Sequence, residues 1–167
     1  ALGRVALVAG VDTRGRTVRQ AMDEGVIAEG SVDTAVASGS DVVVLAVPVG
    51  SVVETAWRVI RHIGDDTVLT DTGSTKAHIV ESIERVFPSF VGSHPIAGRE
   101  DPGYASSRAD LFDGAATIIT PTEKTRPGCI DRVRTLWETC GSVSYTHLRA
   151  HATPEHLLCR LLLAKKQ

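Results

Sequence analysis

Short runs of consecutive apolar residues alternate along this chain with longer stretches in which apolar residues recur every three to four positions. The short runs are rich in β-branched residues, which is typical of strands buried on both faces. They are Val5–Val11, Asp41–Val47, Thr67–Thr70, Phe90–Gly92 and Ala116–Thr120. The periodic stretches predict amphipathic helices at Thr17–Glu24, Ser51–Ile63, Thr75–Phe87 and Ile130–Thr139. Strands and helices in strict alternation predict an α/β fold with a doubly wound, mostly parallel sheet and flanking helices.

Composition and charge narrow the class of protein. With 167 residues, 43% of them hydrophobic and 23% charged, the chain can bury the core of one domain. The net charge of −2 is scattered, without a basic stripe or patch, so neither nucleic acid nor a membrane is an expected partner. The longest apolar stretch is interrupted by Pro48 and is far shorter than the ~20 residues that span a bilayer.

The cysteines and the absence of an export signal bear on the compartment. Cys129, Cys140 and Cys159 form no CxxC pair, and no segment has the pattern of a signal peptide. Thiols in such a chain are expected to be reduced. The sequence therefore predicts a cytoplasmic protein.

Candidate ligand-binding residues follow the predicted strands, because ligands of doubly wound sheets bind beyond the carboxyl ends of the strands. Asp12 ends the first strand, where a carboxylate accepts hydrogen bonds from an adenosine ribose, and Thr13 adjoins it. An ordinary turn aspartate is the alternative interpretation. Arg14 suits a 2′-phosphate, but the Asp12 carboxylate would repel one, so NAD is favoured over NADP.

Two further candidate segments follow the second and third runs. Ala46, Val47 and Pro48 are small or lack a donor, so a cofactor could lie flat against their backbone, although Pro48 is equally typical of a helix start. After the third run come Thr72, Gly73 and Ser74. Gly73 permits a tight turn, and Ser74 or the threonine after it is expected to cap the next helix.

The last candidate is His94, in the segment Gly92–Gly98 that follows the fourth run. A histidine between a strand and a proline-fixed turn lies at the carboxyl edge of the sheet, where a ligand can reach its imidazole. A purely structural role is the alternative interpretation.

Four motifs together resemble one family. DVVVLAVPV, TDTGSTK, VGSHPIAGRE and RADLFDGAATIITPT occur in the order found in the nucleotide domain of prephenate dehydrogenases. The resemblance covers roughly Val5 to Ser142. Its most specific part is the pairing of GSTK with SHPIAG, whereas DxxxxAVP is shared by many nucleotide-binding dehydrogenases.

The resemblance implies roles for the matching residues. His94 corresponds to the residue that hydrogen-bonds the ring hydroxyl of prephenate and takes up its proton, and Ser74 to the group that holds this histidine and hydroxyl in register. Hydride transfer to NAD and loss of carbon dioxide then give 4-hydroxyphenylpyruvate, on the route to tyrosine. Arg99 stands where a small or polar residue is expected. The implied cofactor-binding residues are Asp12, Thr13, Ala46, Val47, Pro48, Thr72 and Gly73.

The resemblance also predicts what the chain lacks. The family's domain opens with a strand and a GxGxxG turn that binds the pyrophosphate, and this sequence contains no such turn. Residues 1–142 are therefore predicted to be a partial dinucleotide-binding domain, an incomplete Rossmann-like sheet without its first strand. Nothing after residue 142 resembles the helical domain that completes the active site and forms a homodimer, so little or no activity is expected from the chain alone.

The segment 143–167 is predicted to be a non-native tail. VSYTHLRAH and LxCRLLLxKK match translations of sequencing-adapter DNA in one reading frame. The alternative is a native amphipathic helix over Glu155–Lys166. The histidines of this tail and one of its cysteines match no closed zinc pattern, so no metal site is predicted. They are His147, His151, His156 and Cys159.

Three alternatives to prephenate oxidation stay open. The first is an arogenate dehydrogenase, whose discriminating residues would lie in the helical domain. The second is another Rossmann oxidoreductase, such as a hydroxyacid dehydrogenase, although the lysine expected on a later helix is not visible. The third is a non-catalytic remnant that binds nucleotide weakly or not at all.

Overall fold

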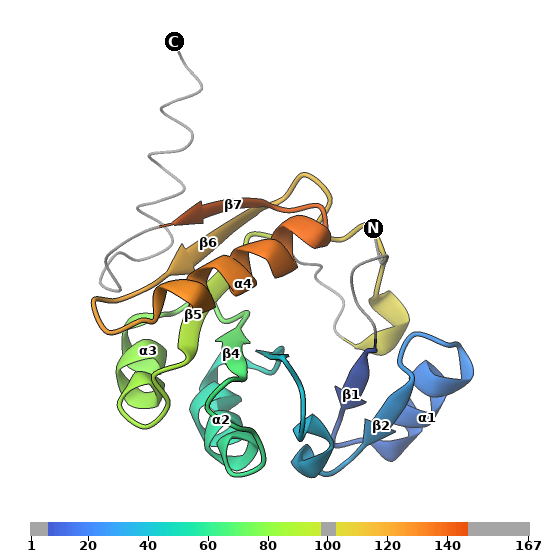
Figure 1. The fold of residues 1–167 in the computed structure, drawn as a ribbon. Helices are drawn as coiled ribbons and strands as arrows, with labels where there is room; N and C mark the ends of the chain where they lie inside the picture. The colour runs from blue at the N-terminus through green and yellow to red at the C-terminus, as the bar shows by residue number, and fades with distance from the viewer. Residues whose placement is uncertain (1–6, 98–102, 147–167) are drawn as a thin grey trace.

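A computed structural model describes residues 7–97 and 103–146 of the chain, and in these ranges strands and helices alternate (Figure 1). The strands are β1 (Ala9–Val11), β2 (Glu29–Ser31), β3 (Val42–Leu45), β4 (Val68–Asp71), β5 (Phe90–Pro95), β6 (Ala116–Thr120) and β7 (Val143–Thr146). The α-helices are α1 (Gly15–Asp23), α2 (Val52–Ile60), α3 (Ala77–Glu84) and α4 (Pro127–Thr139). Short 3₁₀ helices are η2 (Thr34–Ala37), η3 (Val49–Ser51) and η4 (Tyr104–Ser106).

The strands form two sheets, which we call the small lobe and the large sheet. The small lobe is the parallel pair β1–β2 with α1 and η2, and the large sheet has the order β3-β4-β5-β6-β7. Every pairing in the large sheet is parallel except that of β5 with β6. The predicted α/β class and the mostly parallel sheet are therefore confirmed.

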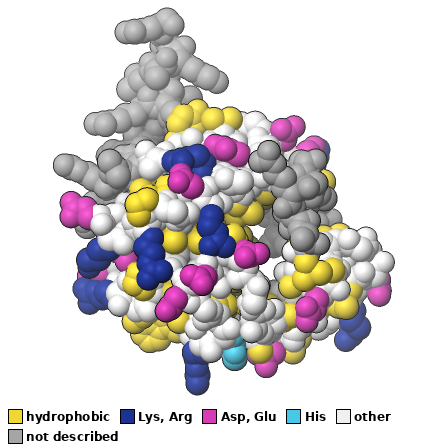
Figure 2. Space-filling view, viewed as in Figure 1, with side chains coloured by type: hydrophobic (Ala, Val, Ile, Leu, Met, Phe, Trp, Pro, Cys, Tyr) yellow, Lys and Arg dark blue, Asp and Glu magenta, His cyan; other side chains and the backbone are white. Residues whose placement is uncertain are grey.

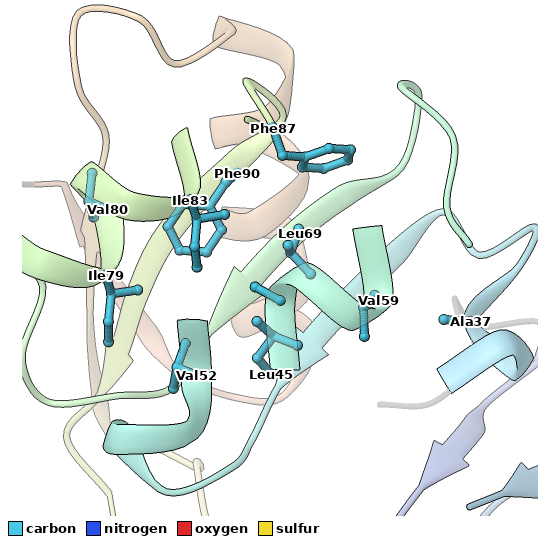
Figure 3. Close-up of a cluster of buried hydrophobic side chains, with 11 residues drawn as sticks. Ala37, Leu45, Val52, Val59, Leu69, Ile79, Val80, Ile83, Phe87 and Phe90 are labelled. Carbon is cyan, nitrogen blue, oxygen red and sulfur yellow. The ribbon is translucent and has the colours of Figure 1, made fainter. Parts of the chain in front are cut away.

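Helices cover both faces of the large sheet. Neighbouring residues of a strand point to opposite faces, so each strand packs against helices on both sides. Leu69 and Phe90 pack with α2 and α3 on one face, in the cluster drawn in Figure 3. The adjacent residues Val68 and Val91 pack instead against Val133 and other residues of α4 on the opposite face. The doubly wound arrangement predicted from the unbroken apolar runs is thus present.

The predicted elements differ from the observed ones in informative places. β2 was not predicted, because Glu29–Ser31 carries no apolar residue; its path depends on Gly30, where an added Cβ would lie 2.5 Å from Val18 Cγ1. β5 continues to Pro95 instead of ending at Gly92, because the antiparallel pairing with β6 extends it. α4 begins at Pro127, three residues before the predicted start, with proline in its first turn.

The start of the segment predicted to be non-native lies in a described strand. Val143–Thr146 is β7, which pairs in parallel with β6 at the edge of the large sheet. Residues 147–167, including the three histidines and Cys159, lie outside the described residues. The non-native origin of 143–167 therefore stays a prediction.

Charged side chains of both signs are scattered over the face of the molecule in view (Figure 2). No described helix has the length and apolar character that a membrane crossing requires. Cys129 and Cys140 are both free thiols, the first buried and the second exposed.

Candidate functional site

Two loops and one strand meet at the carboxyl end of β3, β4 and β5. Leu45 and Asp71, the last residues of β3 and β4, lie side by side in register, and the Thr72 amide donates to the Leu45 carbonyl at 3.2 Å. The loops that follow are Ala46–Pro48 and Thr72–Ser74. His94, in the part of β5 that extends past the pairing with β4, reaches the Thr72 carbonyl.

Gly73 is required by the close packing of this edge. A Cβ on Gly73 would lie 3.0 Å from Asp71 Oδ2, 3.2 Å from Ile79 Cδ1 and 3.3 Å from Val49 Cγ2. The chain bends at Ser74, but no hydrogen-bonded turn forms at Gly73, so glycine suits this position because the loop between β4 and the residues after β3 is crowded and not because of the predicted tight turn.

His94 is half-buried and has a defined ring orientation. Its Nδ1 lies 3.3 Å from the Thr72 carbonyl oxygen, and because a carbonyl only accepts hydrogen bonds, Nδ1 is the protonated nitrogen. In the neutral ring Nε2 is then free of a proton. Burial lowers the pKa of His94 below its ordinary value of 6.5, and the nearby Lys76 charge lowers it further, while the Thr72 bond and Asp71 oppose them. The neutral imidazole, which can act as a base, is thereby favoured.

Asp71 is the most heavily hydrogen-bonded group next to this histidine. Its carboxylate is fully buried and accepts hydrogen bonds from the Gly73 amide at 3.0 Å, from the Ser93 amide at 3.2 Å and from Lys76 Nζ. Burial raises the pKa of Asp71 and lowers that of Lys76, and the ion pair between them opposes both changes. Both residues lie in the predicted segment TDTGSTK, but no role was predicted for either, since a single acid after an apolar run gives no signal of what it contacts.

Ser74 does not cap a helix, contrary to the prediction. α3 begins at Ala77, its N-cap residue is Lys76, and no side chain of that residue bonds the helix end. The reason is that the Asp71 carboxylate holds the Gly73 amide, so the loop turns around this carboxylate before the helix starts. Ser74 and Thr75 are exposed, and within the described residues no hydrogen bond joins Ser74 to His94.

Asp12 and Thr13 lie at the carboxyl end of β1, in the small lobe. Asp12 Oδ1 accepts a hydrogen bond from the Arg14 amide at 2.7 Å, and Arg14 Nε lies 3.4 Å from the same oxygen. The Arg14 amide is the main cause of a lowered pKa for Asp12, which therefore stays ionised. The turn interpretation of Asp12 is confirmed, and the predicted ribose contact stays a prediction.

The remaining sequence-predicted positions have simple surroundings. Pro48 precedes η3 with φ of −50°, so the helix-start interpretation holds, and Ala46 is exposed next to the half-buried Val47. Gly98 and Arg99 lie outside the described residues. Among the residues at 7–97 and 103–146, no group of three histidine, cysteine, aspartate or glutamate side chains could hold a metal ion.

Comparison with known proteins identifies the family to which the chain belongs. The sequence model of the family described as prephenate dehydrogenase, nucleotide-binding domain, matches residues 1–146. The chain belongs to this family. The predicted resemblance is therefore confirmed, and it extends four residues past Ser142 to the end of β7.

Individual members of the prephenate dehydrogenase family match the chain over part of their length. The prephenate dehydrogenase of Bacillus subtilis is 36% identical over 101 residues, which are 56% of this chain and 26% of that protein. The crystal structure of the Aquifex aeolicus prephenate dehydrogenase superposes with a TM-score of 0.82 at 30% identity, covering 98% of this chain and 63% of that chain. The Synechocystis arogenate dehydrogenase has a TM-score of 0.82 at 26% identity, covering 85% and 51%. The chain thus spans about a quarter of the Bacillus relative and under two thirds of either solved chain.

Proposed function

We propose that this chain is the nucleotide-binding part of an NAD-dependent enzyme that converts prephenate to 4-hydroxyphenylpyruvate in tyrosine biosynthesis. The observation that carries the proposal is the His94 ring at the carboxyl edge of the sheet, with Nδ1 bonded to the Thr72 carbonyl and Nε2 left as a base. The Aquifex aeolicus relative was solved with hydroxyphenyl propionate, a phenol with a three-carbon acid side chain, and NAD+. That ligand pair is of the same chemical class as the proposed product and cofactor.

In the proposed reaction, His94 Nε2 accepts the proton of the ring hydroxyl while the hydrogen on the same ring carbon departs with its electron pair. NAD supplies the acceptor for this hydride when it is bound. The ring carboxylate then leaves as carbon dioxide, and its bonding electrons complete the aromatic ring. The proton held on His94 returns to the oxygen that becomes the phenol. Ser74, exposed two residues beyond the carbonyl that orients His94, is proposed to hold the hydroxyl in register.

The residues at the carboxyl edge fit a dinucleotide. The exposed Ala46 and Pro48 leave the surface after β3 accessible, which suits the flat nicotinamide end; the half-buried Val47 and Thr72 and the buried Gly73 lie beside it. At the other end, the ionised Asp12 uses Oδ1 for the Arg14 contacts. Its Oδ2 has no hydrogen-bond partner among the described residues, so it suits the ribose hydroxyls, beside Thr13.

We also propose that the chain is part of a longer protein, in which one more strand lies between β1 and β3. The Val8 carbonyl accepts from Ala28 on the β2 side, so the backbone groups of Ala9 and Val11 face away from β2. By the same alternation, those of Val44 face away from β4. The described residues leave β1 and β3 unpaired with each other. A first strand in this place, followed by a Gly-rich turn, is the usual dinucleotide-binding arrangement.

The proposal has three further parts: a second domain, a compartment and an alternative substrate. A helical domain of the longer protein would complete the substrate site and form a homodimer. The free Cys129 and Cys140 thiols support a reducing compartment, the cytoplasm. Arogenate is the second candidate substrate, because the Synechocystis arogenate dehydrogenase has the same fold with a TM-score of 0.82.

The test begins with the longer gene product. The genomic sequence on both sides is recovered, the protein is produced, and NADH formation is followed with prephenate and with arogenate. We expect prephenate to be preferred, and His94→Asn to lower kcat by about 100-fold or more, the usual contribution of a general base. His62→Asn, at an exposed position in the loop after α2, is the matched control and should leave kcat unchanged. Undiminished oxidation by His94→Asn would show that His94 is not the base, and a genuine stop codon upstream would support a non-catalytic remnant.

A further inference from the structure

We propose that Asp71 is a positioning residue that fixes the ring orientation and the tautomer of His94 through the Thr72–Gly73 peptide. The inference rests on the proposed function for the importance of His94, but the contacts on which it depends are independent of the substrate. Asp71 touches neither the His94 ring nor any group assigned to substrate. It acts through one backbone peptide and through the strand that carries the histidine.

The first step is the Thr72–Gly73 peptide. Its N–H donates to Asp71 Oδ2 at 3.0 Å, and its carbonyl accepts from His94 Nδ1 at 3.3 Å. In a trans peptide these two groups lie in one plane and point in opposite directions. A hydrogen bond that fixes the N–H therefore also fixes the direction in which the carbonyl faces His94.

The second step is the strand β5. The other carboxylate oxygen, Asp71 Oδ1, accepts from the amide of Ser93, the residue immediately before His94. One buried carboxylate thus holds both the acceptor and the backbone of the donor, and its two oxygens serve two segments that are 22 residues apart in sequence. An asparagine at this position has a single acceptor oxygen and cannot serve both segments.

We call the Asp71 carboxylate with the Gly73 and Ser93 amides the clamp. The third step is the attachment of this clamp to the core. Ser93 Oγ donates to the Asp71 carbonyl at 2.6 Å and accepts from Trp137 Nε1 at 3.0 Å. Thr70 Oγ1, at 2.8 Å, supplies the remaining contact of the same hydroxyl. Ser93 and Thr70 are fully buried and Trp137 nearly so, so α4 on the far face holds the clamp rigid.

Lys76 opposes protonation of the Asp71 carboxylate. Burial favours the protonated acid, which would convert one acceptor oxygen into a donor, and the buried Lys76 ammonium opposes this change. The predicted cost of removing one partner alone is high, because an unpaired buried charge is left behind. A neutral double variant avoids that cost.

The experiment measures the His94 tautomer in the chain itself. Nitrogen NMR with isotope-labelled histidine distinguishes Nδ1–H from Nε2–H rings, and His94→Gln identifies the His94 signals among the six histidines. Above the pKa of His94 we expect the Nδ1–H form in the wild-type chain. The double variant Asp71→Asn with Lys76→Met should shift His94 to a mixture or to the Nε2–H form. Glu84→Gln is the matched control: Glu84, on α3, is another buried carboxylate and accepts from Thr122 Oγ1, so its replacement should leave the His94 signals unchanged.

Two results would overturn the proposal: an Nε2–H ring in the wild-type chain, or an unchanged Nδ1–H ring in a folded double variant. Should this double variant not fold, Asp71→Asn with Lys76→Gln, which is also neutral and leaves a polar partner for the amide, is measured by the same signals, with the same two outcomes. In the longer enzyme the double variant should lower kcat about tenfold or more with little change in the KM for NAD, since misorientation of a base affects the chemical step. A different pair of results would separate the two proposals. If the double variant loses the Nδ1–H tautomer but the wild-type longer enzyme does not oxidise prephenate, the proposed function is refuted and the role of Asp71 stands.

Discussion

The small lobe and the large sheet follow the same alternation of strand and helix, but they bury their strands to different extents. All four residues of β4 are buried, whereas β1 has two exposed residues of three, and Val11 is 46% exposed. The buried residues described in the small lobe are Val18 and Ala21 of α1 and Thr34 and Ala37 of η2, and Ala37 packs into the core cluster of the large sheet. Burial of apolar surface is the main favourable contribution to folding, so the large sheet should account for most of the stability of the chain.

The largest expected effect is in the core of the large sheet. Phe90→Ala removes a ring that is 1% exposed and packs among α2, α3 and β4, so the free energy of unfolding should fall by about 3–5 kcal/mol. Denaturant unfolding of the chain measures this change. Phe90→Leu, which retains most of the volume, should cost less than half as much; equal losses would mean that this cluster does not dominate stability.

A smaller and more local effect is expected in the small lobe. Gly30→Ala places a methyl group 2.5 Å from Val18 Cγ1 and 2.9 Å from Ile27 Cδ1, and such overpacking costs about 1–3 kcal/mol. Amide exchange should accelerate in β1, β2 and α1 while β4 and β5 keep their protection. Gly50→Ala, where no atom lies within 4 Å of the new Cβ, is the control. Uniform loss of protection would show that the two regions unfold as one unit.

The pH dependence of stability should be a property of the large sheet, because His94 lies in β5. The folded pKa of His94 lies below its ordinary value of 6.5, so the unfolded chain binds the proton first as the pH falls. The stability that the neutral His94 contributes is fully present above pH 6.5 and is lost as the pH falls through its lowered folded pKa. Thermal melts across this window should show a shallower decline for His94→Gln than for the wild type. A steeper decline would reverse the direction inferred for this pKa.

Sequence reasoning succeeded where burial alone decides the structure. The runs around Leu69 and Ile119 are apolar on consecutive positions because both faces of the sheet are covered there, and each run is a strand. The run around Val44 is also a strand, although Val44 itself is 37% exposed. β2 was not predicted, because its Glu-Gly-Ser sequence has no apolar periodicity. The strand depends on the close packing of Gly30 against Val18 of α1, a contact that periodicity does not reveal.

The candidate site shows the same limit. His94 and the loop from Thr72 to Ser74 were predicted at the carboxyl edge because strand order places them there, and the structure brings His94 and Thr72 together. The role of Asp71 was not predicted, since its partners are backbone amides of Gly73 and Ser93. Any residue except proline has a backbone amide that could donate in this way, so no pattern of residue types marks these partners.

The smallest expected effect tests whether the edge of β1 is open. Val11→Thr changes a 46% exposed side chain on this edge and should alter the free energy of unfolding by less than about 0.5 kcal/mol. The same substitution at Val68, which is fully buried in β4, should cost about 1–3 kcal/mol because it buries a hydroxyl group. In the longer protein, a strand between β1 and β3 would cover Val11, and the cost of Val11→Thr should rise toward that of Val68→Thr. An unchanged small cost there would mean that no strand pairs with this edge, and the small lobe would then be a peripheral element instead of one half of a continuous sheet.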